Sequence, residues 1–447
     1  MTNEKYGLIG KTLVHSYSKE IHEALGRYQY QLFSLAEDEM PDFINARDFR
    51  GLNVTIPYKK DVIPLCDEVT DLARGIGAVN TLFWKNASGT GASESISQED
   101  KILVGHNTDY EGFLYAASHA GIDFEGKGVL ILGTGGTSLM ARRAAADQNA
   151  AKIYIASRHP ETDPPSGSEI QDAGILSTVS YDQLPEIADS IDVIVNTTPV
   201  GTFPNNMQQV IRLKDFPGCQ AVIDVIYNPF KTALLLEAEK LGLKYTNGLP
   251  MLVAQATAAA GYFLGTPGAF QKENQRIIKS MKQQIGNIVL IGMPGTGKSL
   301  IGKLLAELTG KTLQDTDAKI EEEAKMTIPE IFEKEGETGF RDRESAICKK
   351  LGKERNLIIA TGGGAILRPE NVDALRQNGT LVHITRSIDK LPTRGRPLSQ
   401  NIETLKKMEA QRMPLYKSAA DITFRNNYTC SRKKLRQRVN TYILEKL

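Results

Sequence analysis

Short apolar runs alternate with helical spacing near the start of the chain. The runs at residues 6–9, 51–56 and 78–84 predict strands, and the apolar spacing over residues 21–25 predicts a helix. Alternation of this kind indicates an α/β layer. Residues 86–100 are polar and separate two apolar runs, so we expect them to form a long, mobile hairpin tip.

A second α/β pattern begins at Gly128. Its predicted strands are apolar throughout and alternate with helical stretches; they cover residues 129–132, 152–156, 193–196 and 221–225. A strand that is buried on both faces reads as a continuous apolar run. This second sheet is therefore expected to be parallel, with helices on both of its faces.

The chain changes character near residue 285. An Ala-rich helical stretch at 249–264 and a more polar helix at 271–284 precede this point, and an apolar strand at 287–291 follows it. We therefore expect a domain boundary there. Near the end of the chain, apolar residues recur at every fourth position over residues 435–447, which predicts a helix with a solvated face of Lys and Arg.

Length and composition limit the possible functions. The chain has 447 residues, enough for about three domains. Lys and Arg total 54 against 53 Asp and Glu, so neither nucleic acid nor an acidic membrane is an expected partner. The expected partners are small molecules. The four cysteines lie far apart, and neither a leader sequence nor a spanning apolar run is evident, which favours a cytoplasmic protein with free thiols.

Residues 292–299 read G-M-P-G-T-G-K-S, between a predicted strand and a predicted helix. In such a loop, backbone N–H groups converge on the β- and γ-phosphates of a nucleoside triphosphate, a lysine adds positive charge, and a hydroxyl reaches Mg²⁺. The residues predicted to make these contacts are Gly292, Gly295, Thr296, Gly297, Lys298 and Ser299. The alternative is an ordinary glycine-rich turn.

A dinucleotide-binding pattern follows the strand at 129–132 and opens a helix. It consists of Gly133, Gly135, Gly136, Thr137 and Ser138. Glycine lets the backbone turn tightly and approach a pyrophosphate at the helix N-terminus. About 20 residues on, where NAD enzymes carry an acidic residue, this chain has Ser157 and Arg158. A guanidinium suits a 2′-phosphate and favours NADP, unless Arg158 is an ordinary surface residue.

The first half of the chain resembles shikimate dehydrogenase in an ordered set of motifs. They are H-S-Y-S at 15–18, N-V-T-I-P-Y-K at 53–59, A-V-N-T at 78–81, G-H-N-T-D at 105–109, N-T-T-P-V-G at 196–201, the segment 224–229, and G-L-P-M-L-V-A-Q at 248–255. The resemblance implies substrate contacts from Ser16, Ser18, Thr55, Asn80 and Gln255, a catalytic pair of Lys59 and Asp109, and cofactor contacts that include Thr198 and Gly248.

The chemistry of ketone reduction agrees with the implied pair. Hydride transfer to a ketone leaves an alkoxide, and a lysine ammonium can stabilise it and deliver the proton. Asp109 would orient the Lys59 ammonium. A structural ion pair is the alternative explanation. The sequence leaves open which of the two residues is the proton donor.

From residue 287 onward the chain resembles shikimate kinase. The motifs are D-T-D at 315–317, the segment 336–344, T-G-G-G at 361–364, R-P-L at 396–398 and R-M-P-L-Y at 412–416. The resemblance implies that Asp315 serves Mg²⁺, that Asp317 and Gly363 face the substrate, that Arg341 and Arg412 hold its carboxylate, and that Arg396 anchors a lid. Only Gly395 stands between Arg394 and Arg396, so the lid is expected to be short.

The two resemblances together predict a bifunctional α/β enzyme that reduces 3-dehydroshikimate with NADPH and phosphorylates shikimate with ATP and Mg²⁺. The expected domains are a substrate-binding domain (1–112 with 248–284), a Rossmann-type NADP domain (113–247) and a P-loop kinase domain with a parallel sheet (286–447). Two alternatives remain: an NAD-using quinate/shikimate dehydrogenase fused to a kinase, or one half as a non-catalytic binding module.

Overall fold

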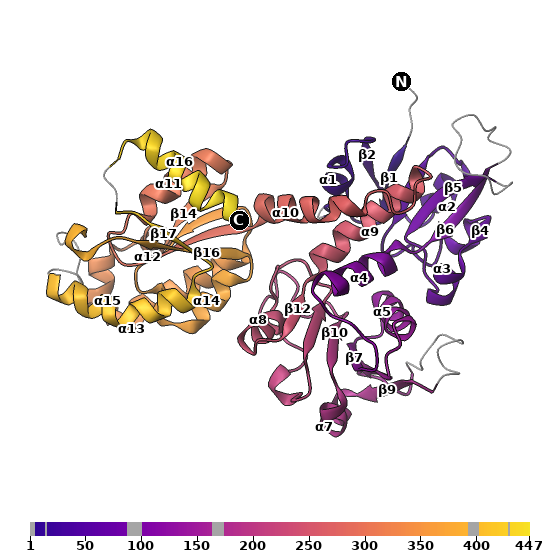
Figure 1. Ribbon diagram of the computed structural model, residues 1–447, viewed down its shortest axis with the longest axis horizontal. Coiled ribbons are helices and arrows are strands. Elements are labelled where there is room, and N and C mark those ends of the chain that lie inside the picture. Colours follow the sequence, from indigo (N-terminus) through magenta and orange to yellow (C-terminus); the bar gives the residue numbers. More distant parts are fainter. Residues whose placement is uncertain (1–4, 14–15, 87–100, 163–173, 392–401, 428–429) are drawn as a thin grey trace. The chain divides into compact units, whose positions relative to one another are not determined.

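The computed structural model describes residues 5–13, 16–86, 101–162, 174–391, 402–427 and 430–447 (Figure 1). The chain divides into two compact units. The first comprises Met1–Thr202 with Gln208–Ile278, and the second comprises Lys279–Leu447 with the short segment Phe203–Met207. Each unit is an α/β structure, as the sequence predicted.

The first sheet is mixed. Its strands are β1 (Tyr6–Gly10), β2 (Tyr30–Ser34), β3 (Gly51–Val54), β4 (Glu68–Val69), β5 (Thr81–Asn86) and β6 (Lys101–His106), in the order β2-β1-β3-β5-β6-β4. Strand β5 runs antiparallel to β3 and β6, and the other described pairs are parallel. Helices α1 (Ser18–Glu23), α2 (Glu39–Asn45) and α3 (Asp71–Ile76) connect them. The predicted hairpin tip between β5 and β6 lies outside the described residues, apart from Asn86.

The second sheet is parallel throughout its described pairs, as predicted. Its strands are β7 (Gly128–Leu132), β8 (Lys152–Ser157), β9 (Leu176–Ser180), β10 (Val193–Asn196), β11 (Ala221–Asp224) and β12 (Lys244–Thr246), in the order β12-β11-β10-β7-β8-β9. Consecutive strands of this sheet are connected through helices α5 (Gly136–Asp147), α7 (Leu184–Ile187) and α8 (Ala233–Lys240). In β7, Val129 and Ile131 pack into one core and Leu130 and Leu132 into another, which explains why the strand is apolar at every position.

Two helices of the first unit pack backbone to backbone. They are α4 (Thr108–His119) and α9 (Gly248–Phe263), which lie side by side in Figure 1. A Cβ atom at Gly112 would lie only 2.6 Å from the carbonyl oxygen of Met251, so the approach requires glycine. Helix α9 is apolar around most of its circumference because it is buried on nearly every side. This packing fixes the first turn of α4 relative to α9.

The second unit contains a parallel sheet in the order β14-β15-β13-β16-β17. The strands are β13 (Asn287–Ile291), β14 (Thr312–Asp315), β15 (Leu357–Ala360), β16 (Gly379–Thr385) and β17 (Ile422–Arg425). Helices α11 (Lys298–Thr309), α12 (Thr316–Ala324), α13 (Ile328–Lys353), α14 (Pro369–Arg376), α15 (Ile402–Ala419) and α16 (Arg432–Tyr442) surround it. Helix α13 is kinked at Gly336, and Leu435, Val439 and Ile443 of the predicted C-terminal helical pattern are buried.

Helix α10 (Asn274–Ile285) contains the division between the units, which falls after Ile278. The predicted boundary near residue 285 therefore lies at the end of this helix, directly before β13. None of the described helices has the length and apolar composition needed to cross a bilayer. All four cysteines are free thiols.

We predict that the two units unfold separately. Leu130 in β7 and Leu290 in β13 are both fully buried, and a Leu→Ala change at such a site costs about 2–5 kcal/mol of unfolding free energy. Trp84, the one tryptophan of the chain, lies in β5, so its fluorescence reports the first unit. Leu130→Ala should shift the urea transition of Trp84 to lower concentration, whereas Leu290→Ala should leave it in place and speed hydrogen exchange in β13.

Equal shifts of the Trp84 transition in both variants would mean that the chain unfolds as one cooperative structure.

Candidate active sites

The loop between β13 and α11 is held in a conformation that only glycine adopts readily. Gly292, Gly295 and Gly297 have φ angles of 143°, 85° and 98°. A Cβ atom at Gly292 would lie 2.3 Å from the carbonyl oxygen of Ile384 in the neighbouring strand. The hydroxyl of Thr296 donates to the Met293 carbonyl at 2.9 Å and closes the loop on itself. The backbone is therefore shaped before any ligand arrives.

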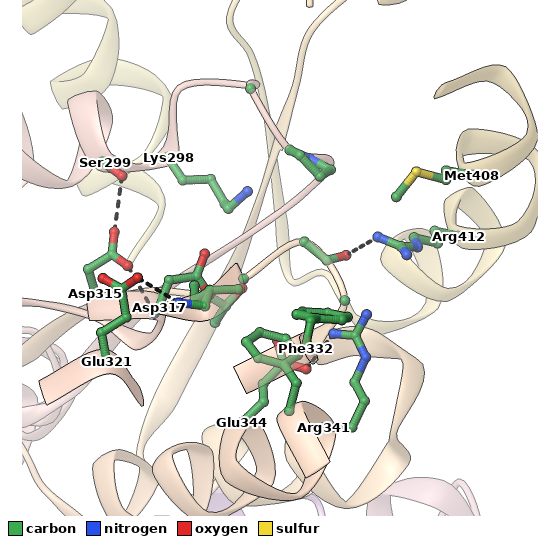
Figure 2. Close-up of a pocket in the computed structure, with 18 of the residues that line it drawn as sticks. Lys298, Ser299, Asp315, Asp317, Glu321, Phe332, Arg341, Glu344, Met408 and Arg412 are labelled. Carbon is green, nitrogen blue, oxygen red and sulfur yellow. Dashed lines mark hydrogen bonds and ion pairs between the residues drawn. The ribbon is translucent and has the colours of Figure 1, made fainter. Parts of the chain in front are cut away.

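Lys298 begins helix α11 and is largely buried. Its Nζ donates to the carbonyl oxygens of Gly292 and Met293, at 2.8 and 3.1 Å. Figure 2 shows its side chain reaching across the pocket side of the loop. The ammonium is thus placed where the phosphates of a nucleotide on this loop would need charge neutralisation.

Two oxygen-bearing side chains meet beside the loop. The hydroxyl of Ser299 donates to Oδ2 of Asp315 at 3.1 Å, while Oδ1 of Asp315 accepts from the N–H of Asp317 at 3.1 Å and so caps helix α12. Among the described residues no group of three or more His, Cys, Asp or Glu could hold a metal ion. An ion between Ser299 and Asp315 would therefore need phosphate or water oxygens as further ligands, as Mg²⁺ commonly has.

Asp317 lies at the start of α12 and faces the same pocket. Burial raises the pKa of its carboxyl to about 6, with Asp315 and Glu344 adding to the rise and Lys298 and Arg341 opposing it. The carboxyl therefore gains a proton far more readily than an exposed aspartate does. This is the behaviour expected of a group that exchanges a proton with a bound hydroxyl.

The turn after β15 forms a wall of three glycines against the reacting groups. A Cβ atom at Gly362 would lie 2.7 Å from carboxylate oxygens of Asp317 and Glu344. At Gly363 it would lie 2.7 Å from the ring of Pro294, and at Gly364 it would lie 2.0 Å from Nη1 of Arg341. A side chain at each position would therefore have to displace a different neighbour.

Two arginines lie on the other side of this wall. Arg341 donates to Glu344 at 2.7 Å and to Glu337 at 3.1 Å, and Arg412 donates to the carbonyl of Gly363 at 2.9 Å. In Figure 2 both guanidinium groups lie across the pocket from Ser299 and Asp315. Planar guanidinium groups that converge in this way suit a carboxylate ligand.

These groups line one cavity of about 600 Å³. Its lining also includes apolar side chains, which are Ile328, Phe332, Phe340 and Met408. The cavity thus combines a phosphate-type loop, a carboxyl pair, two arginines and an apolar floor. A small anionic molecule with hydroxyl groups fits this chemistry, next to a nucleotide on the loop.

In the first unit, Lys59 and Asp109 form an ion pair. Nζ of Lys59 donates to Oδ2 of Asp109 at 2.6 Å, and the two side chains are 26% and 20% exposed. Lys59 follows β3, and Asp109 lies in the first turn of α4. The N–H of Val79 donates to the carbonyl of Lys59 at 2.8 Å, which ties the Lys59 segment to the Asn80 segment.

Asn80 is the centre of a buried polar network. Its Oδ1 accepts from the N–H of Thr108 at 2.7 Å and from the hydroxyl of Thr81 at 2.9 Å. Its Nδ2 donates to Oε1 of Gln255 on α9 at 3.4 Å. Because the acceptor side of the amide is occupied, the donor side must point toward Gln255. The sequence predicted both residues as substrate contacts, and the fold brings them together.

The remaining predicted substrate contacts lie near the start of the chain. Ser16 and Ser18 stand with their hydroxyl oxygens 3.1 Å apart, and the N–H of Ser18 donates to Oγ of Ser16. The N–H of Thr55 donates to the carbonyl of Ile9 in β1. Thr55 follows β3, so this hydrogen bond ties its segment to the neighbouring strand β1.

The predicted dinucleotide turn joins β7 to α5. Gly133 has a φ angle of 98°, Gly135 caps α5, and Cβ atoms at Gly135 or Gly136 would meet nothing within 4 Å. Thr137 is in the first turn of the helix. Open space in front of these glycines fits the approach of a pyrophosphate. Thr198 packs beside Gly133, since a Cβ there would lie 3.0 Å from its methyl group.

Ser138 and Gly248 have other neighbours. Ser138 is fully buried, its N–H donates to Gly135 and its hydroxyl accepts from Arg142, so this geometry does not favour it as a cofactor contact. Gly248 instead lets the backbone pass Val225, because a Cβ there would lie 1.9 Å from the Val225 carbonyl.

At the end of β8, Arg158 is exposed. Burial raises the pKa of the nearby Tyr181 hydroxyl, and the charge of Arg158 opposes this rise. Oγ of the neighbouring Ser157 accepts from the N–H of His159 at 2.9 Å.

Known proteins match both units. A profile of the shikimate kinase family matches residues 294–447, and one of the shikimate dehydrogenase substrate binding domain matches residues 8–82. A shikimate dehydrogenase (NADP(+)) of Caldicellulosiruptor bescii is 35% identical over 268 residues, which cover 57% of this chain and 88% of that protein. A shikimate kinase of Nitrosomonas europaea is 47% identical over 145 residues, 31% of this chain and 69% of that protein.

The chain belongs to both families. It is a bifunctional enzyme of the shikimate pathway, with a shikimate dehydrogenase unit followed by a shikimate kinase unit, as the sequence predicted. A solved structure agrees with this: a chorismate mutase/shikimate 5-dehydrogenase fusion protein from Clostridium acetobutylicum has a TM-score of 0.54 and 32% identity, and the match covers 63% of this chain and 98% of that one.

The sequence reasoning missed several residues of the kinase site. Glu344 is fully buried beneath Arg341. It lies in the segment 336–344, but the sequence predicted no role for it, although its spacing from Arg341 is that of neighbours on a helix. The apolar lining of the cavity, including Phe332, gave no signal that separates it from ordinary core. Arg394 and Arg396 lie outside the described residues, so the short lid stays a prediction.

Asn426 is a further residue that the sequence did not single out. It follows β17 and is largely buried, and its Nδ2 donates to the carbonyl of Thr296 in the phosphate-binding loop at 2.8 Å. A Cβ at Gly297 would lie 2.5 Å from the same nitrogen. Asn426 therefore anchors the loop to the last strand of the sheet.

We predict that Asn426→Ala raises the KM of the kinase for ATP by roughly five- to tenfold, the equivalent of one lost hydrogen bond, and leaves the KM for shikimate nearly unchanged. Steady-state kinetics measure both. Asn427→Ala is the matched control, because the Asn427 amide exchanges two 2.7 Å hydrogen bonds with Ser387 and not with the loop. If both variants behaved alike, the anchoring role of Asn426 would be refuted.

Proposed function

We propose that the two units catalyse consecutive reactions: NADPH-dependent reduction of 3-dehydroshikimate to shikimate, then phosphorylation of the shikimate 3-hydroxyl by ATP with Mg²⁺. The observation that carries the proposal is that each unit holds its own set of reacting groups, the Lys59–Asp109 pair in one and the cavity with Asp317 and Lys298 in the other. The product of the first reaction is the substrate of the second.

In the dehydrogenase unit, NADPH supplies the hydride when bound. The Lys59 ammonium stabilises the alkoxide that forms and is held in place by Asp109, 2.6 Å away. Asn80 and Gln255 bind ring hydroxyls, and their mutual hydrogen bond sets their orientation before the substrate arrives. Ser16 and Ser18, with Thr55, bind the substrate carboxylate through hydroxyl donors.

The cofactor site of this unit lies at the turn after β7. The backbone at Gly133, Gly135, Gly136 and Thr137 binds the pyrophosphate, and Thr198 packs against the same turn. Ser157 and Arg158 bind the 2′-phosphate of the adenosine ribose. The exposed guanidinium of Arg158 supports this choice, because a bound 2′-phosphate needs a partner of positive charge.

In the kinase unit, ATP supplies the phosphoryl group and Mg²⁺ neutralises charge on its phosphates. Ser299 and Asp315 would hold the ion, and their oxygen donor set fits Mg²⁺. Lys298 and the loop N–H groups bind phosphate oxygens. Asp317 accepts a hydrogen bond from the 3-hydroxyl and takes its proton, while Arg341 and Arg412 grip the carboxylate against Gly363. The role of Arg396 as the lid anchor is proposed from the family resemblance alone.

Three domains would carry these steps. They are residues 1–112 with 248–284 for 3-dehydroshikimate, 113–247 for NADP(H), and 286–447 for ATP and shikimate. The three separate sheets support this division.

Two rival functions remain testable. An NAD-using quinate/shikimate dehydrogenase would keep the same pair of Lys59 and Asp109, and Arg158 speaks against it. A non-catalytic binding module would be expected to lack a reacting group, whereas each unit of this chain has its own set. Incubation of the purified chain with 3-dehydroshikimate, NADPH and MgATP, followed by identification of the product, distinguishes the proposed enzyme from both rivals, because only the proposed enzyme yields shikimate 3-phosphate.

We predict that the two activities are separable by single substitutions. Lys59→Ala should lower dehydrogenase kcat by at least the roughly 10²-fold that an acid–base group contributes and spare the kinase, and Lys298→Ala should do the reverse. The urea transition of Trp84 checks that the first unit of Lys59→Ala is folded, and hydrogen exchange in β13 checks the second unit of Lys298→Ala. Loss of NADPH oxidation in a folded Lys298→Ala protein would contradict the assignment.

We also predict a preference for NADPH over NADH of roughly ten- to a hundredfold in kcat/KM, since a charged hydrogen bond from Arg158 contributes about 1.5 to 3 kcal/mol. Arg158→Ala should narrow this gap. The control is Arg212→Ala, which removes another exposed arginine of the same unit. Similar kcat/KM for both cofactors in the unmutated enzyme would instead favour the NAD-using rival.

A further inference from the structure

Asp224 is a fully buried carboxylate with no role in the reactions proposed above. It ends strand β11 and opens the 224–229 motif. Its Oδ1 accepts from Nδ2 of Asn196 and from the N–H of Ile226, both at 3.1 Å, and its Oδ2 accepts from the hydroxyl of Thr232 at 2.6 Å. A buried carboxylate is costly even with three donors, so its presence calls for a reason.

The carboxylate determines how the Asn196 amide is oriented. Asn196 ends β10 and is directly opposite Asp224 in the register of the sheet. Because Nδ2 of Asn196 donates to Asp224, its Oδ1 faces Thr198 and accepts from the Thr198 N–H at 3.1 Å and hydroxyl at 2.7 Å. A flipped amide would place an oxygen against the carboxylate and lose all of these bonds.

The oriented amide holds the loop that follows β10 against the cofactor turn. Thr198 contacts Gly133, as described above, and its Oγ accepts from the N–H of Val200 at 3.3 Å. At the end of the loop, a Cβ at Gly201 would lie 3.5 Å from Thr232, the residue that also donates to Asp224. The start of the loop is therefore held by hydrogen bonds that lead back to Asp224, and its end at Gly201 lies close to Thr232.

We propose that Asp224 is a positioning residue for the dehydrogenase cofactor: through the Asn196 amide it holds Thr198 against the Gly133 turn and thereby sets the affinity for NADP(H). The inference rests on the proposed cofactor site. It adds a residue that does not touch the cofactor and acts through another side chain.

The charge of Asp224 makes this role measurable. Burial raises the pKa of its carboxyl to about 6, against the three hydrogen bonds, which lower it. The donors on β10, on the segment after β11 and at the start of α8 are all neutral, and among the described residues the charges near that helix, Lys231 and Glu239, pair with each other at 2.6 Å. Asp224 is thus ionised above about pH 6 and neutral below.

The neutral form is copied by a substitution. When Oδ2 takes a proton, the Thr232 hydroxyl can turn to accept it, and Oδ1 becomes an uncharged acceptor for Asn196. Asp224→Asn produces the same arrangement at every pH, because its Nδ2 faces Thr232 and its Oδ1 faces Asn196. A hydrogen bond to a charged acceptor is about twice as strong as one to a neutral acceptor, so the hold on Thr198 weakens in both cases.

The experiment compares NADP⁺ binding by the full-length unmutated enzyme and by Asp224→Asn, using calorimetric titration from pH 5 to 8.5. The 2′-phosphate of NADP⁺ itself titrates near pH 6, so the ratio of the two Kd values is the readout, in which that titration cancels. We expect Asp224→Asn to bind roughly five- to tenfold more weakly above pH 7, and the ratio to approach one near pH 5. At pH 7.5, KM for NADPH should rise by a similar factor while dehydrogenase kcat changes less than about twofold.

Asp192→Asn is the matched control. Asp192 precedes β10 at the opposite end of the strand, where its carboxylate accepts from the N–H of Gly128 at 2.9 Å and from the side chain of Gln220 at 3.1 Å. It should leave the affinity for NADP⁺ unchanged at every pH. The urea transition of Trp84, which reports the first unit, verifies that each variant is folded there.

Two results would overturn the inference. A Kd ratio of one at all pH values, in an enzyme that binds NADP⁺, would show that the Asn196 amide is held without the charge of Asp224. A ratio above one that is constant with pH, or is matched by Asp192→Asn, would show that the effect is a general loss of packing. If the unmutated enzyme failed to bind NADP⁺ at any pH, the proposed cofactor site itself would be wrong.

Discussion

Parallel strand pairing in register is the constraint on which both nucleotide sites depend. It places the carboxyl ends of neighbouring strands at one sheet edge, whatever the length of chain between them. In the second sheet Leu132, Asn196 and Asp224 are aligned in this way, and in the third Asp315 is aligned with Ala360. Three parts of the sites begin at these ends: the cofactor turn after β7, the loop 196–201 after β10, and the kinase carboxyl groups of Asp315 and Asp317 after β14. A register shift of one residue would therefore disassemble each site.

The two sites solve the problem of burying charge differently. In the kinase unit Arg341 is matched by a buried carboxylate, Glu344, so that the guanidinium is already neutralised and oriented before a ligand carboxylate arrives. In the dehydrogenase unit Asp224 has only neutral donors, and its charge is maintained by hydrogen bonds alone. The first arrangement places an opposite charge beside the buried group, whereas the second depends on neutral donors.

Local signals in the sequence predicted the parts of the fold that local chemistry determines. The phosphate-binding loop and the cofactor turn need glycine at fixed positions, and strands such as β7 are apolar because both of their faces are covered. Edge strands escaped prediction: β2 pairs on one side only, and four of its five residues are at least partly exposed, so Tyr30–Ser34 carries no apolar run. Ser138 was assigned to the cofactor by its spacing, whereas the fold buries it against Arg142, a contact that the motif does not encode.

The three glycines at 362–364 have a consequence for chemical inhibition. They present backbone, and no side chain, to one wall of the kinase cavity, and a side chain at each would press on a different neighbour: Asp317 with Glu344, Pro294, and Arg341. An inhibitor that draws its affinity from this wall would rest on a surface that the chain cannot alter by point mutation without displacing its own reacting groups. Resistance would then be expected elsewhere in the lining, at side chains such as Phe332 or Met408.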